Sequence, residues 1–254
     1  INAMLRDVLT GELVDLWGGQ ADLAARRIRH INDSTFVEDA LRVFRAAQFA
    51  ARFGFRIEEN TRRAMDACMD GLDALARERV MTELTGFLLA ARADDLTNAA
   101  NLLCRCIPEL TATVGFDQKN PHHEHDIFTH TAQVVERAPK DPVMRMAALL
   151  HDVGKVDTFT LDKNGVGHFY GHARLGAEMA DGILRRLKCS NALRKEVTWL
   201  IHHHMDRFPC DEKSARRCLS KNGLLRMERL TMMQMADFGG KVDEGDLDEW
   251  LALL

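Results

Sequence analysis

The sequence predicts a mainly α-helical protein with a small β-hairpin at its N-terminal end. Residues 38–53 repeat apolar side chains with helical spacing, as do several later segments. Residues 9–12 carry a turn signal between two short β-tolerant segments. An apolar run over 143–150 has the character of a buried helix and ends abruptly in His151 and Asp152. Because hydrophobic periodicity is the primary local signal of secondary structure, helices should form most of the fold.

The composition is that of a globular chain with one large domain or two modest ones. Of its 254 residues, 46% are hydrophobic and 28% are charged, and the formal net charge is -4. No apolar run approaches a membrane span and we find no signal peptide, so we expect a cytoplasmic protein without a membrane partner. The six cysteines form no Cys-x-x-Cys pair, which is typical of reduced thiols. Because the chain opens on Ile1, we expect further residues before it.

The N-terminal elements follow from turn and helix signals. Residues 2–8 and 12–17 are expected to pair as a hairpin. A hairpin alone is marginal in water, so these strands should complete a sheet whose other strands lie elsewhere. A short helix is expected over 21–27, and a long one over 38–53 that ends at Gly54.

The polar side of the 38–53 helix is expected to carry Asp39, Arg42 and Arg45. Asp39 and Arg42 are spaced i, i+3 and can form an ordinary helix salt bridge. Alternatively, a carboxylate beside a guanidinium can pair with the amino group and ring nitrogen of cytosine or adenine. Both interpretations remain open from the residues alone.

Further helices are expected over 60–70, 78–92 and 95–106, followed by a turn at Pro108. Residues 115–121 then read as a linker into a second helical region.

The centre of that second region is the pair His151 and Asp152. We expect Gly154 to end the preceding helix in a left-handed cap. Burying an imidazole or a carboxylate without a partner costs several kcal/mol. A cation shared by both groups would remove that cost. The alternative is a helix-capping histidine beside a salt-bridged aspartate.

Two distant residues favour the cation. His130 lies in a segment with helical periodicity for which Asp126 is a plausible N-cap, and Asp237 lies on the apolar face of a helix near residue 230. With His151 and Asp152 they form a mixed nitrogen and oxygen ligand set. Such a set suits Mg, Mn, Fe, Co, Ni or Zn and not a thiolate site.

Two more histidines are candidates for the same region. An Asn-Gly turn at 164–165 predicts a hairpin, after which His172 should open a helix to residue 188. In the next predicted helix, 191–205, His204 continues the apolar face. We therefore expect His204 to point inward, His203 less so, and His202 to be exposed.

The order His130, His151-Asp152, Asp237 resembles the HD-domain metal-dependent phosphohydrolases. The resemblance implies an all-α domain in which these residues bind a divalent metal and His172 supplies a further ligand or phosphate contact. If His204 also ligates, the site could hold two ions, among Mg, Mn, Ni or Co, that share Asp152. They would clamp a phosphate and activate a water, as two-metal sites do.

In that resemblance His151 and Asp152 are catalytic residues together with Lys155. The lysine, which follows the pair at the helix exit, would neutralise charge on the phosphate. No protein nucleophile would then be required.

A second resemblance covers nearly the whole chain. Glu38-Asp39-x-x-Arg42 followed by Arg45 resembles the nucleotide-template motif of bacterial tRNA nucleotidyltransferases (CCA-adding enzymes) and poly(A) polymerases. Residues 53–58, 78–84 and 107–110 are similar to that family's helical neck. The resemblance implies nucleotide binding by Asp39, Arg42 and Arg45, with ATP and CTP as substrates of the full-length enzyme and the 3′ end of tRNA or other RNA as its partner. A homodimer is also considered.

The expected domains are the end of a nucleotidyltransferase head at 1–31, a helical neck for RNA and nucleotide binding at 32–114, and an HD phosphohydrolase domain at 115–254. Many members of the family carry an HD domain after the neck. It would hydrolyse phosphomonoesters or 2′,3′-cyclic phosphates.

The sequence departs from this family at its start. The paired aspartates and the Arg-Arg-Asp-x-Thr motif that serve nucleotidyl transfer would precede Ile1 and are not in this sequence. We therefore expect a base template without the transfer metals. Two rival interpretations stay open: a free-standing HD nucleotide phosphohydrolase, and an RNA-binding scaffold with a metal-stabilised core.

Overall fold

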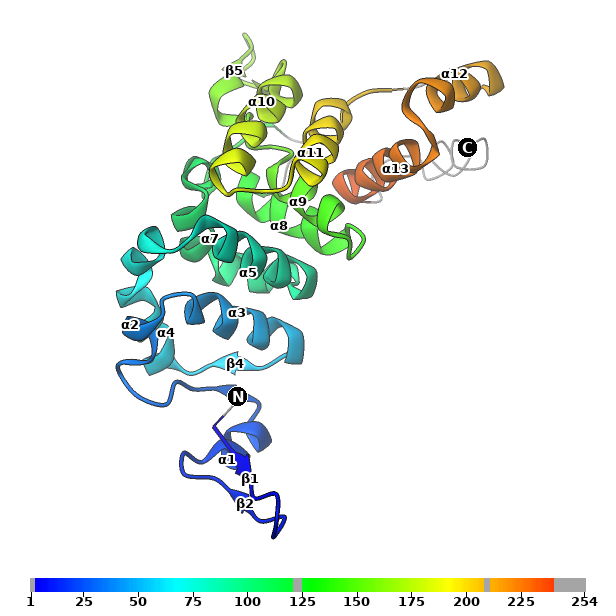
Figure 1. Cartoon of the computed structure of the whole chain (residues 1–254). Helices are drawn as coiled ribbons and strands as arrows, with labels where there is room; N and C mark the ends of the chain where they lie inside the picture. Colours follow the sequence, from blue (N-terminus) through cyan, green and yellow to red (C-terminus); the bar gives the residue numbers. More distant parts are fainter. Residues whose placement is uncertain (1–2, 121–124, 208–210, 240–254) are drawn as a thin grey trace. The chain divides into compact units, whose positions relative to one another are not determined.

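A computed structural model describes residues 3–120, 125–207 and 211–239. Its contacts divide the chain into two compact units, Ile1–Ala91 and Arg92–Leu254. Both are built mainly from helices, and their few strands are two residues long (Figure 1). The predicted mainly α-helical class is confirmed.

The N-terminal unit opens with the predicted hairpin. Strand β1 (Leu5–Arg6) pairs antiparallel with β2 (Leu13–Val14). The Asp7 carboxylate accepts two backbone N–H groups within the turn, and Gly11 adopts a φ of +74°. Both strands are exposed, and within the described residues no further strand joins the hairpin.

Helix α1 (Gly19–Ala24) leads into a second pair of strands. Strand β3 (Arg27–Ile28) lies parallel to β4 (Arg56–Ile57). Two parallel strands require a crossover connection, and the connection between β3 and β4 is mainly helical.

The helix predicted over 38–53 is confirmed from Arg42 to Phe53, but its predicted start is wrong, because Glu38 ends a separate helix. Helix α2 (Thr35–Glu38) ends at Asp39, whose backbone is extended with φ -153° and ψ 100°. The Asp39 carboxylate accepts the backbone N–H of Leu41, and α3 (Arg42–Phe53) begins one residue later. Helix α3 ends at Gly54 with a φ of +63°, which confirms the predicted cap.

The remaining N-terminal helices form the core of this unit. They are α4 (Glu59–Ala67), the 3-10 helix η1 (Met69–Ala74) and α5 (Arg77–Ala90), so the helices predicted over 60–70 and 78–92 are confirmed. Helix α3 packs on α5. Their shared interior is almost fully buried and includes Val43, Phe44, Val80, Leu84 and Phe87.

The C-terminal unit starts with α6 (Ala93–Asn98) and α7 (Ala100–Cys106), where the sequence predicted one helix over 95–106. The predicted turn at Pro108 is the 3-10 helix η2 (Pro108–Thr113). Gly115, at the start of the predicted linker, has a φ of +70°.

Helices α8 (Ile127–Arg137) and α9 (Pro142–Leu150) follow as predicted. Asp126 and Asp141 cap their N-termini, each accepting two backbone N–H groups. Every residue of α9 from Val143 to Leu150 is buried, as expected of a central helix.

A hairpin and two long helices come next. Strands β5 (Thr160–Leu161) and β6 (Gly167–His168) pair antiparallel around Gly165, whose φ is +78°, after a short 3-10 helix, η3 (Val156–Thr158). Helix α10 (His172–Arg186) begins at the predicted residue, and α11 (Asn191–His203) matches the helix expected over 191–205.

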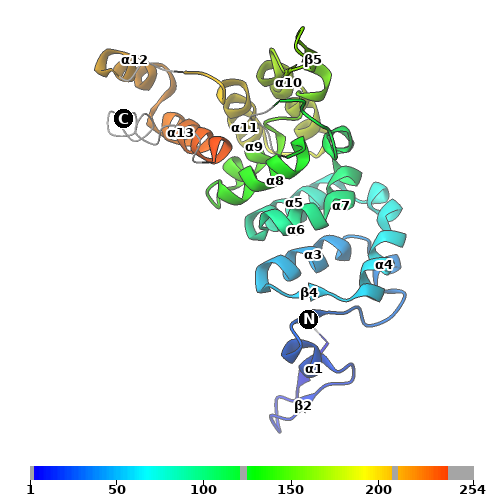
Figure 2. The same ribbon diagram turned by 180° about the vertical axis from the view of Figure 1, so that it is seen from behind.

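Helices α12 (Glu212–Asn222) and α13 (Leu224–Phe238) close the described chain. Helix α9 contacts α8, α11 and α13, so the end of α9 is surrounded by the elements that carry the candidate ligands (Figure 2). None of the helices in the described ranges is long and apolar enough to cross a membrane.

Candidate metal centre

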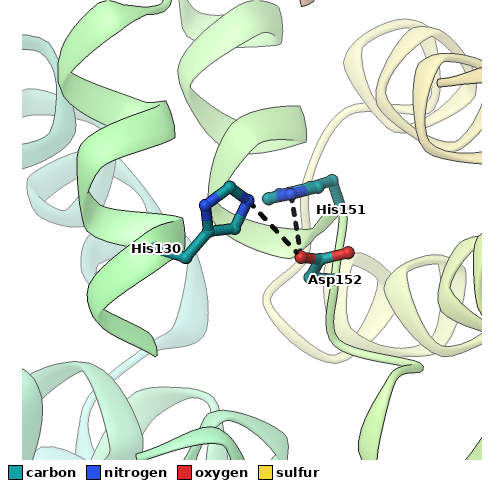
Figure 3. A group of neighbouring side chains, drawn as sticks. All are labelled: His130, His151 and Asp152. Atoms are coloured by element: carbon teal, nitrogen blue, oxygen red, sulfur yellow. Dashed lines mark ion pairs between the residues drawn. The ribbon is translucent and has the colours of Figure 1, made fainter. Parts of the chain in front are cut away.

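Three of the predicted ligands meet at the end of α9. His130 comes from α8, whereas His151 and Asp152 follow the last turn of α9 (Figure 3). The Oδ2 atom of Asp152 lies 3.1 Å from His151 Nε2 and 3.7 Å from His130 Nε2. His151 and Asp152 are only 0% and 2% exposed, so this polar group lies inside the core.

Asp237 reaches the same point from α13. Its Oδ1 atom is 2.9 Å from His130 Nε2 and 3.4 Å from His151 Nε2. The structure thus brings together all four residues of the predicted quartet, although His130 and Asp237 are far apart in the sequence.

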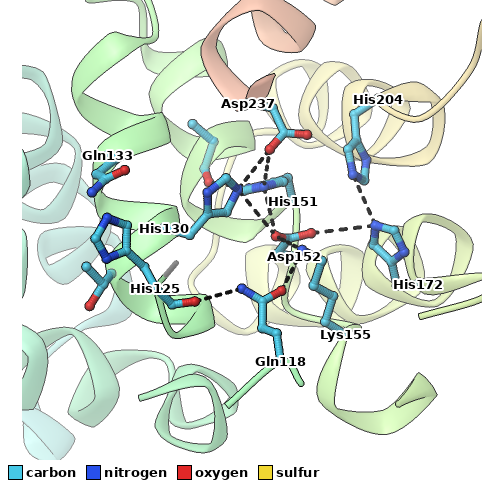
Figure 4. Close-up of polar contacts among 12 residues, drawn as sticks. Gln118, His125, His130, Gln133, His151, Asp152, Lys155, His172, His204 and Asp237 are labelled. Atoms are coloured by element: carbon cyan, nitrogen blue, oxygen red, sulfur yellow. Dashed lines mark hydrogen bonds and ion pairs between the residues drawn. The ribbon is translucent and has the colours of Figure 1, made fainter. Parts of the chain in front are cut away.

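A second group of possible ligands shares Asp152. His172 Nε2, from the first residue of α10, lies 3.5 Å from Asp152 Oδ1 and 3.3 Å from His204 Nε2 (Figure 4). One carboxylate oxygen therefore faces His130 and His151, and the other faces His172. His204 is fully buried, His203 is half-buried and His202 is exposed, which confirms the face predicted for the end of α11.

Three of these histidines are oriented in the same way. Each donates its Nδ1–H to the backbone carbonyl three residues earlier, at 2.7–2.8 Å. The donors are His151, His172 and His204, and the acceptors are Ala148, Phe169 and Ile201. Since a carbonyl can only accept, the Nδ1 atoms carry the protons and the Nε2 atoms are directed at Asp152 and its neighbours. Such hydrogen bonds fix the tautomer and ring orientation of metal-binding histidines.

The electrostatics of the site are those of a buried charge cluster. Burial alone would lower the pKa of His151, but the carboxylates of Asp152 and Asp237 outweigh it and raise that pKa to about 10. Burial, reinforced by the nearby charge of His151, lowers the pKa of His204 to about 4. Burial opposes ionisation of Asp237, yet the charge of His151 and the hydrogen bond with His130 hold its pKa below the usual range.

The donor set fits a divalent metal ion. Among the described residues, the buried atoms His151 Nε2 and Asp152 Oδ2 have no partner with hydrogen-bond geometry, although both form ion pairs, with each other and with Asp237 or Lys155. A cation near both atoms would compensate their desolvation. Imidazole nitrogens with carboxylate oxygens suit Mg, Mn, Co, Ni, Fe or Zn.

Lys155 lies beside this cluster and is held from three sides. Its ammonium is 2.8 Å from Asp152 Oδ2 and 3.2 Å from Gln118 Oε1, and it lies 5.2 Å from the centre of the Phe169 ring. Gln118, only 2% exposed, also donates its Nε2–H to the carbonyl of His125 at 3.0 Å (Figure 4). Gln118 was missed by the sequence analysis because a single glutamine in a linker has no periodicity that would indicate burial.

The expectation for Gly154 is wrong. Its φ is not positive, and α9 ends earlier, at Leu150, with His151 as its C-cap. A Cβ at Gly154 would lie 2.7 Å from both Gly176 N and His172 O, backbone atoms of α10. The glycine is therefore required for the close approach of α10, which carries His172 into the centre.

A cavity of about 690 Å³ opens onto the centre. Its lining includes the ligand candidates His130, Asp152, His172 and Asp237, together with Lys155. The cavity also extends to residues that do not belong to the ligand set, among them Arg137, Tyr170 and Phe238.

The predicted base-template residues lie in the N-terminal unit, and two of them have other partners. Arg42 pairs with Glu38 at 3.0 Å, and Asp39 pairs with Arg79 at 3.1 Å. Of the two interpretations left open for Asp39 and Arg42, the ordinary helix salt bridge is therefore not formed in this structure. Arg42 and Arg45 line a second cavity, of about 450 Å³.

Comparison with protein families agrees with this geometry. Residues 125–236 match the HD domain, and residues 54–111 match the family described as the probable RNA and SrmB-binding site of polymerase A. The fold and the histidine–aspartate centre of the C-terminal unit therefore define an HD-domain protein.

Comparisons over most of the chain show which HD-domain proteins it is similar to. An A-adding tRNA nucleotidyltransferase of Deinococcus radiodurans is 37% identical over 235 residues, which are 87% of this chain and 54% of that protein. A multifunctional CCA protein of Burkholderia pseudomallei is 36% identical over 219 residues, covering 80% of this chain and 52% of that protein. The chain spans about half the length of the curated relatives it matches.

Solved structures share the fold. The CCA-adding enzyme of Bacillus stearothermophilus in complex with CTP aligns with a TM-score of 0.62 and 18% identity, over 99% of this chain and 56% of that one. The chain belongs to the tRNA nucleotidyltransferase and poly(A) polymerase family, as the template, neck and HD motifs predicted.

Proposed function

We propose that the C-terminal unit is a divalent metal-dependent phosphohydrolase. The observation that carries the proposal is the shared carboxylate, since Asp152 directs one oxygen to His130 and His151 and the other to His172. This arrangement offers ligands for one ion or for two. A structural ion would not require Lys155, whose ammonium sits beside the carboxylate at the edge of an open cavity.

The reaction we assign is hydrolysis of a phosphomonoester or a 2′,3′-cyclic phosphate. Water adds its oxygen to phosphorus, one P–O ester bond breaks, and the departing oxygen takes a proton. Divalent metal ions, when bound, supply positive charge beside the phosphoryl oxygens and lower the pKa of the attacking water. Lys155 attracts the phosphate, and the histidines keep the ligand atoms in place through their Nδ1 hydrogen bonds.

Hydrolysis of adenosine 2′,3′-cyclic phosphate and p-nitrophenyl phosphate, with added Ni, Mn, Co or Mg, tests this function. His130→Ala and Asp237→Ala should each abolish turnover and reduce the bound metal found by elemental analysis. His203→Ala is the matched control, because His203 is a half-buried histidine of α11 whose Nδ1 contacts Asp206. Turnover that persists in both ligand variants contradicts the proposal, and metal binding without any turnover favours the RNA-binding scaffold.

For the whole protein we infer a tRNA nucleotidyltransferase that uses CTP and ATP at an RNA 3′ end in the cytoplasm. The relatives named above support this assignment, with Asp39, Arg42 and Arg45 as the base-reading residues. We keep residues 1–31, 32–114 and 115–254 as the proposed head, neck and HD parts.

We propose that the family's transfer carboxylates lie outside the present sequence, so that this chain should add neither CMP nor AMP to a tRNA-like primer. Labelled nucleotide incorporation by this chain would refute that statement. If a version extended at its N-terminus also failed to transfer, a free-standing HD phosphohydrolase would be favoured. Light scattering would test the proposed homodimer.

A further inference from the structure

We propose that Tyr170 is a stacking platform for a nucleobase at the mouth of the metal-centre cavity, so that this site selects nucleoside phosphates over phosphate esters that lack a base. The inference rests on the proposed phosphohydrolase function. It adds to that function a determinant of substrate choice.

The size of the cavity is the first argument. A phosphoryl group alone would fill a small part of about 690 Å³, since a water molecule takes about 30 Å³ of liquid volume. Cavities of about 300–1,000 Å³ commonly enclose organic ligands. The cavity therefore has room for a nucleoside attached to the phosphate.

The second argument is the exposed ring of Tyr170. This side chain is 78% exposed, although it lines the cavity. Its ring is nearly parallel to that of His168, with an interplanar angle of 13° and a centroid distance of 5.3 Å. One face is therefore stacked while the ring stays accessible to a ligand. Proteins bind unpaired bases by stacking them on such exposed aromatic rings.

The third argument is that the platform is anchored. The backbone N–H of Gly167 donates to the carbonyl of Lys119 at 2.8 Å, and the Asn120 side chain donates to the carbonyl of Gly167 at 3.1 Å. His168 itself lies 3.4 Å from an oxygen of Asp162 across the hairpin. Tyr170 follows this anchored hairpin after Phe169, and its ring stacks on that of His168. A ring held beside a fixed hairpin loses less conformational entropy when a base binds.

The position of Tyr170 suits a base linked to a phosphate at the centre. Only Gly171 separates it from His172, a ligand candidate. The cavity lining also contains Arg137, whose guanidinium donates to Gln133 Oε1 and to the carbonyl of Ala236 and pairs with no carboxylate in the part of the chain that the structure describes. With Lys155, it gives the cavity positive charge for an anionic ligand.

The test compares adenosine 2′,3′-cyclic phosphate with glycerol 1,2-cyclic phosphate, which keeps the five-membered cyclic ester and lacks the base. Stacking on an aromatic ring is worth about 1–3 kcal/mol per base, which corresponds to about 5- to 150-fold. Tyr170→Ala should lower the ratio of the two kcat/KM values by a factor in this range, mainly through the KM of the nucleotide. Tyr170→Phe should keep the ratio within about twofold, since it keeps the ring.

Leu161→Ala is the control, because Leu161 is an exposed apolar residue of the hairpin that precedes Tyr170 and does not line the cavity. In Leu161→Ala the ratio of the kcat/KM values for the two cyclic esters should equal that of the wild type. Tyr170 is largely exposed, so its replacement by alanine should leave thermal unfolding unchanged. A wild-type ratio near one, or an unchanged ratio in Tyr170→Ala, would overturn the inference.

Calorimetry separates this inference from the proposed function. Adenosine 3′-monophosphate should bind the metal-loaded protein more tightly than glycerol 2-phosphate, and Tyr170→Ala should remove that difference. If the wild type hydrolyses neither cyclic ester, the phosphohydrolase proposal fails. The binding difference then decides the inference alone: a difference that depends on Tyr170 supports it, and equal binding of both phosphates overturns it.

Discussion

Replacing Gln118 by methionine tests how the ammonium of Lys155 is held. The two side chains have similar length, so the substitution removes both hydrogen bonds of the amide and largely preserves the packing of this buried position. The lost contacts are the one from Lys155 Nζ to Gln118 Oε1, at 3.2 Å, and the one from Gln118 Nε2 to the carbonyl of His125, at 3.0 Å.

The expected magnitude follows from these two contacts. A hydrogen bond that involves a charged group contributes about 1.5–3 kcal/mol, and a neutral one about 0.5–1.5 kcal/mol. His125 is exposed, so water can hydrogen-bond to its carbonyl once Gln118 is replaced. The loss of this neutral hydrogen bond should therefore cost only about 0.5 kcal/mol. Gln118→Met should therefore lower the free energy of unfolding by about 2–3.5 kcal/mol.

Phosphate ester turnover should fall about tenfold in the same variant, equivalent to about 1.4 kcal/mol. The reason is that, of its three contacts named above, Lys155 then keeps those with Asp152 and the Phe169 ring. The assays are urea unfolding of the metal-loaded protein and steady-state kinetics of Gln118→Met, Lys155→Met and the double variant. Contacting residues couple by about 0.5–3 kcal/mol, so the glutamine substitution should have little kinetic effect once the lysine is gone.

Gln133→Met provides the matched control for Gln118→Met. Gln133 lines the same cavity, and its side-chain oxygen accepts from Arg137 one turn later on α8, away from Lys155. Its replacement should cost less than about 0.5 kcal/mol. Equal effects of the two glutamine variants, or kinetic effects of Gln118→Met and Lys155→Met that simply add, would refute the reasoning.

Three further predictions concern stability. Removing the metal with a chelator should lower the Tm of the C-terminal unit by about 5–10 °C, and added Mn should restore the original Tm. The reason is that an ion present at a hundred times its Kd stabilises the folded state by about 2.7 kcal/mol. Gly154→Ala should cost about 1–3 kcal/mol in chemical unfolding and weaken metal binding, because its Cβ would force α10 away. Glu109 and Arg186 form an ion pair at 2.7 Å, which should stabilise the folded protein by about 0.2–1 kcal/mol near neutral pH and lose this effect in acid. Urea unfolding of the wild type and of Glu109→Gln at several pH values measures the difference.

The direction of the pH dependence predicted for the Glu109–Arg186 ion pair follows from the pKa of the Glu109 carboxyl. Burial opposes its ionisation, but the hydrogen bonds from Arg186 prevail and hold its pKa in the folded protein below the ordinary value of 4.5. The stabilisation is therefore complete above that value and disappears as the pH falls through the folded pKa. A stability difference that persists at pH 3 or grows in acid would contradict this assignment. An unchanged Tm after chelation, or wild-type stability in Gly154→Ala, would contradict the other two.

Helical spacing was sufficient to locate much of the candidate metal centre. His204 continues the apolar face of its helix, and the structure buries it while leaving His202 exposed. Asp237 likewise lies on the inward face of α13. In both cases the side-chain direction depends only on the spacing within one helix, which is a local property that the sequence carries.

Contacts between distant residues could not be predicted in this way. The break at Asp39 is accompanied by an ion pair with Arg79, 40 residues later, whereas the local sequence favours one continuous helix. Lys155 meets Gln118 across 37 residues, and the requirement for glycine at 154 arises only when α10 packs against it. Local patterns do not report such tertiary constraints.

The sequence separation of the ligands has a consequence for folding. His130 and Asp237 meet at 2.9 Å although 107 residues separate them. An ion held by both would close a chain loop of that length, and the entropy lost in closing a loop grows with the logarithm of its size. In the unfolded chain the ligands are dispersed, so an ion bound to the folded protein acts as a reversible cross-link. Metal supply would then govern the rate at which the C-terminal unit opens as well as its chemistry.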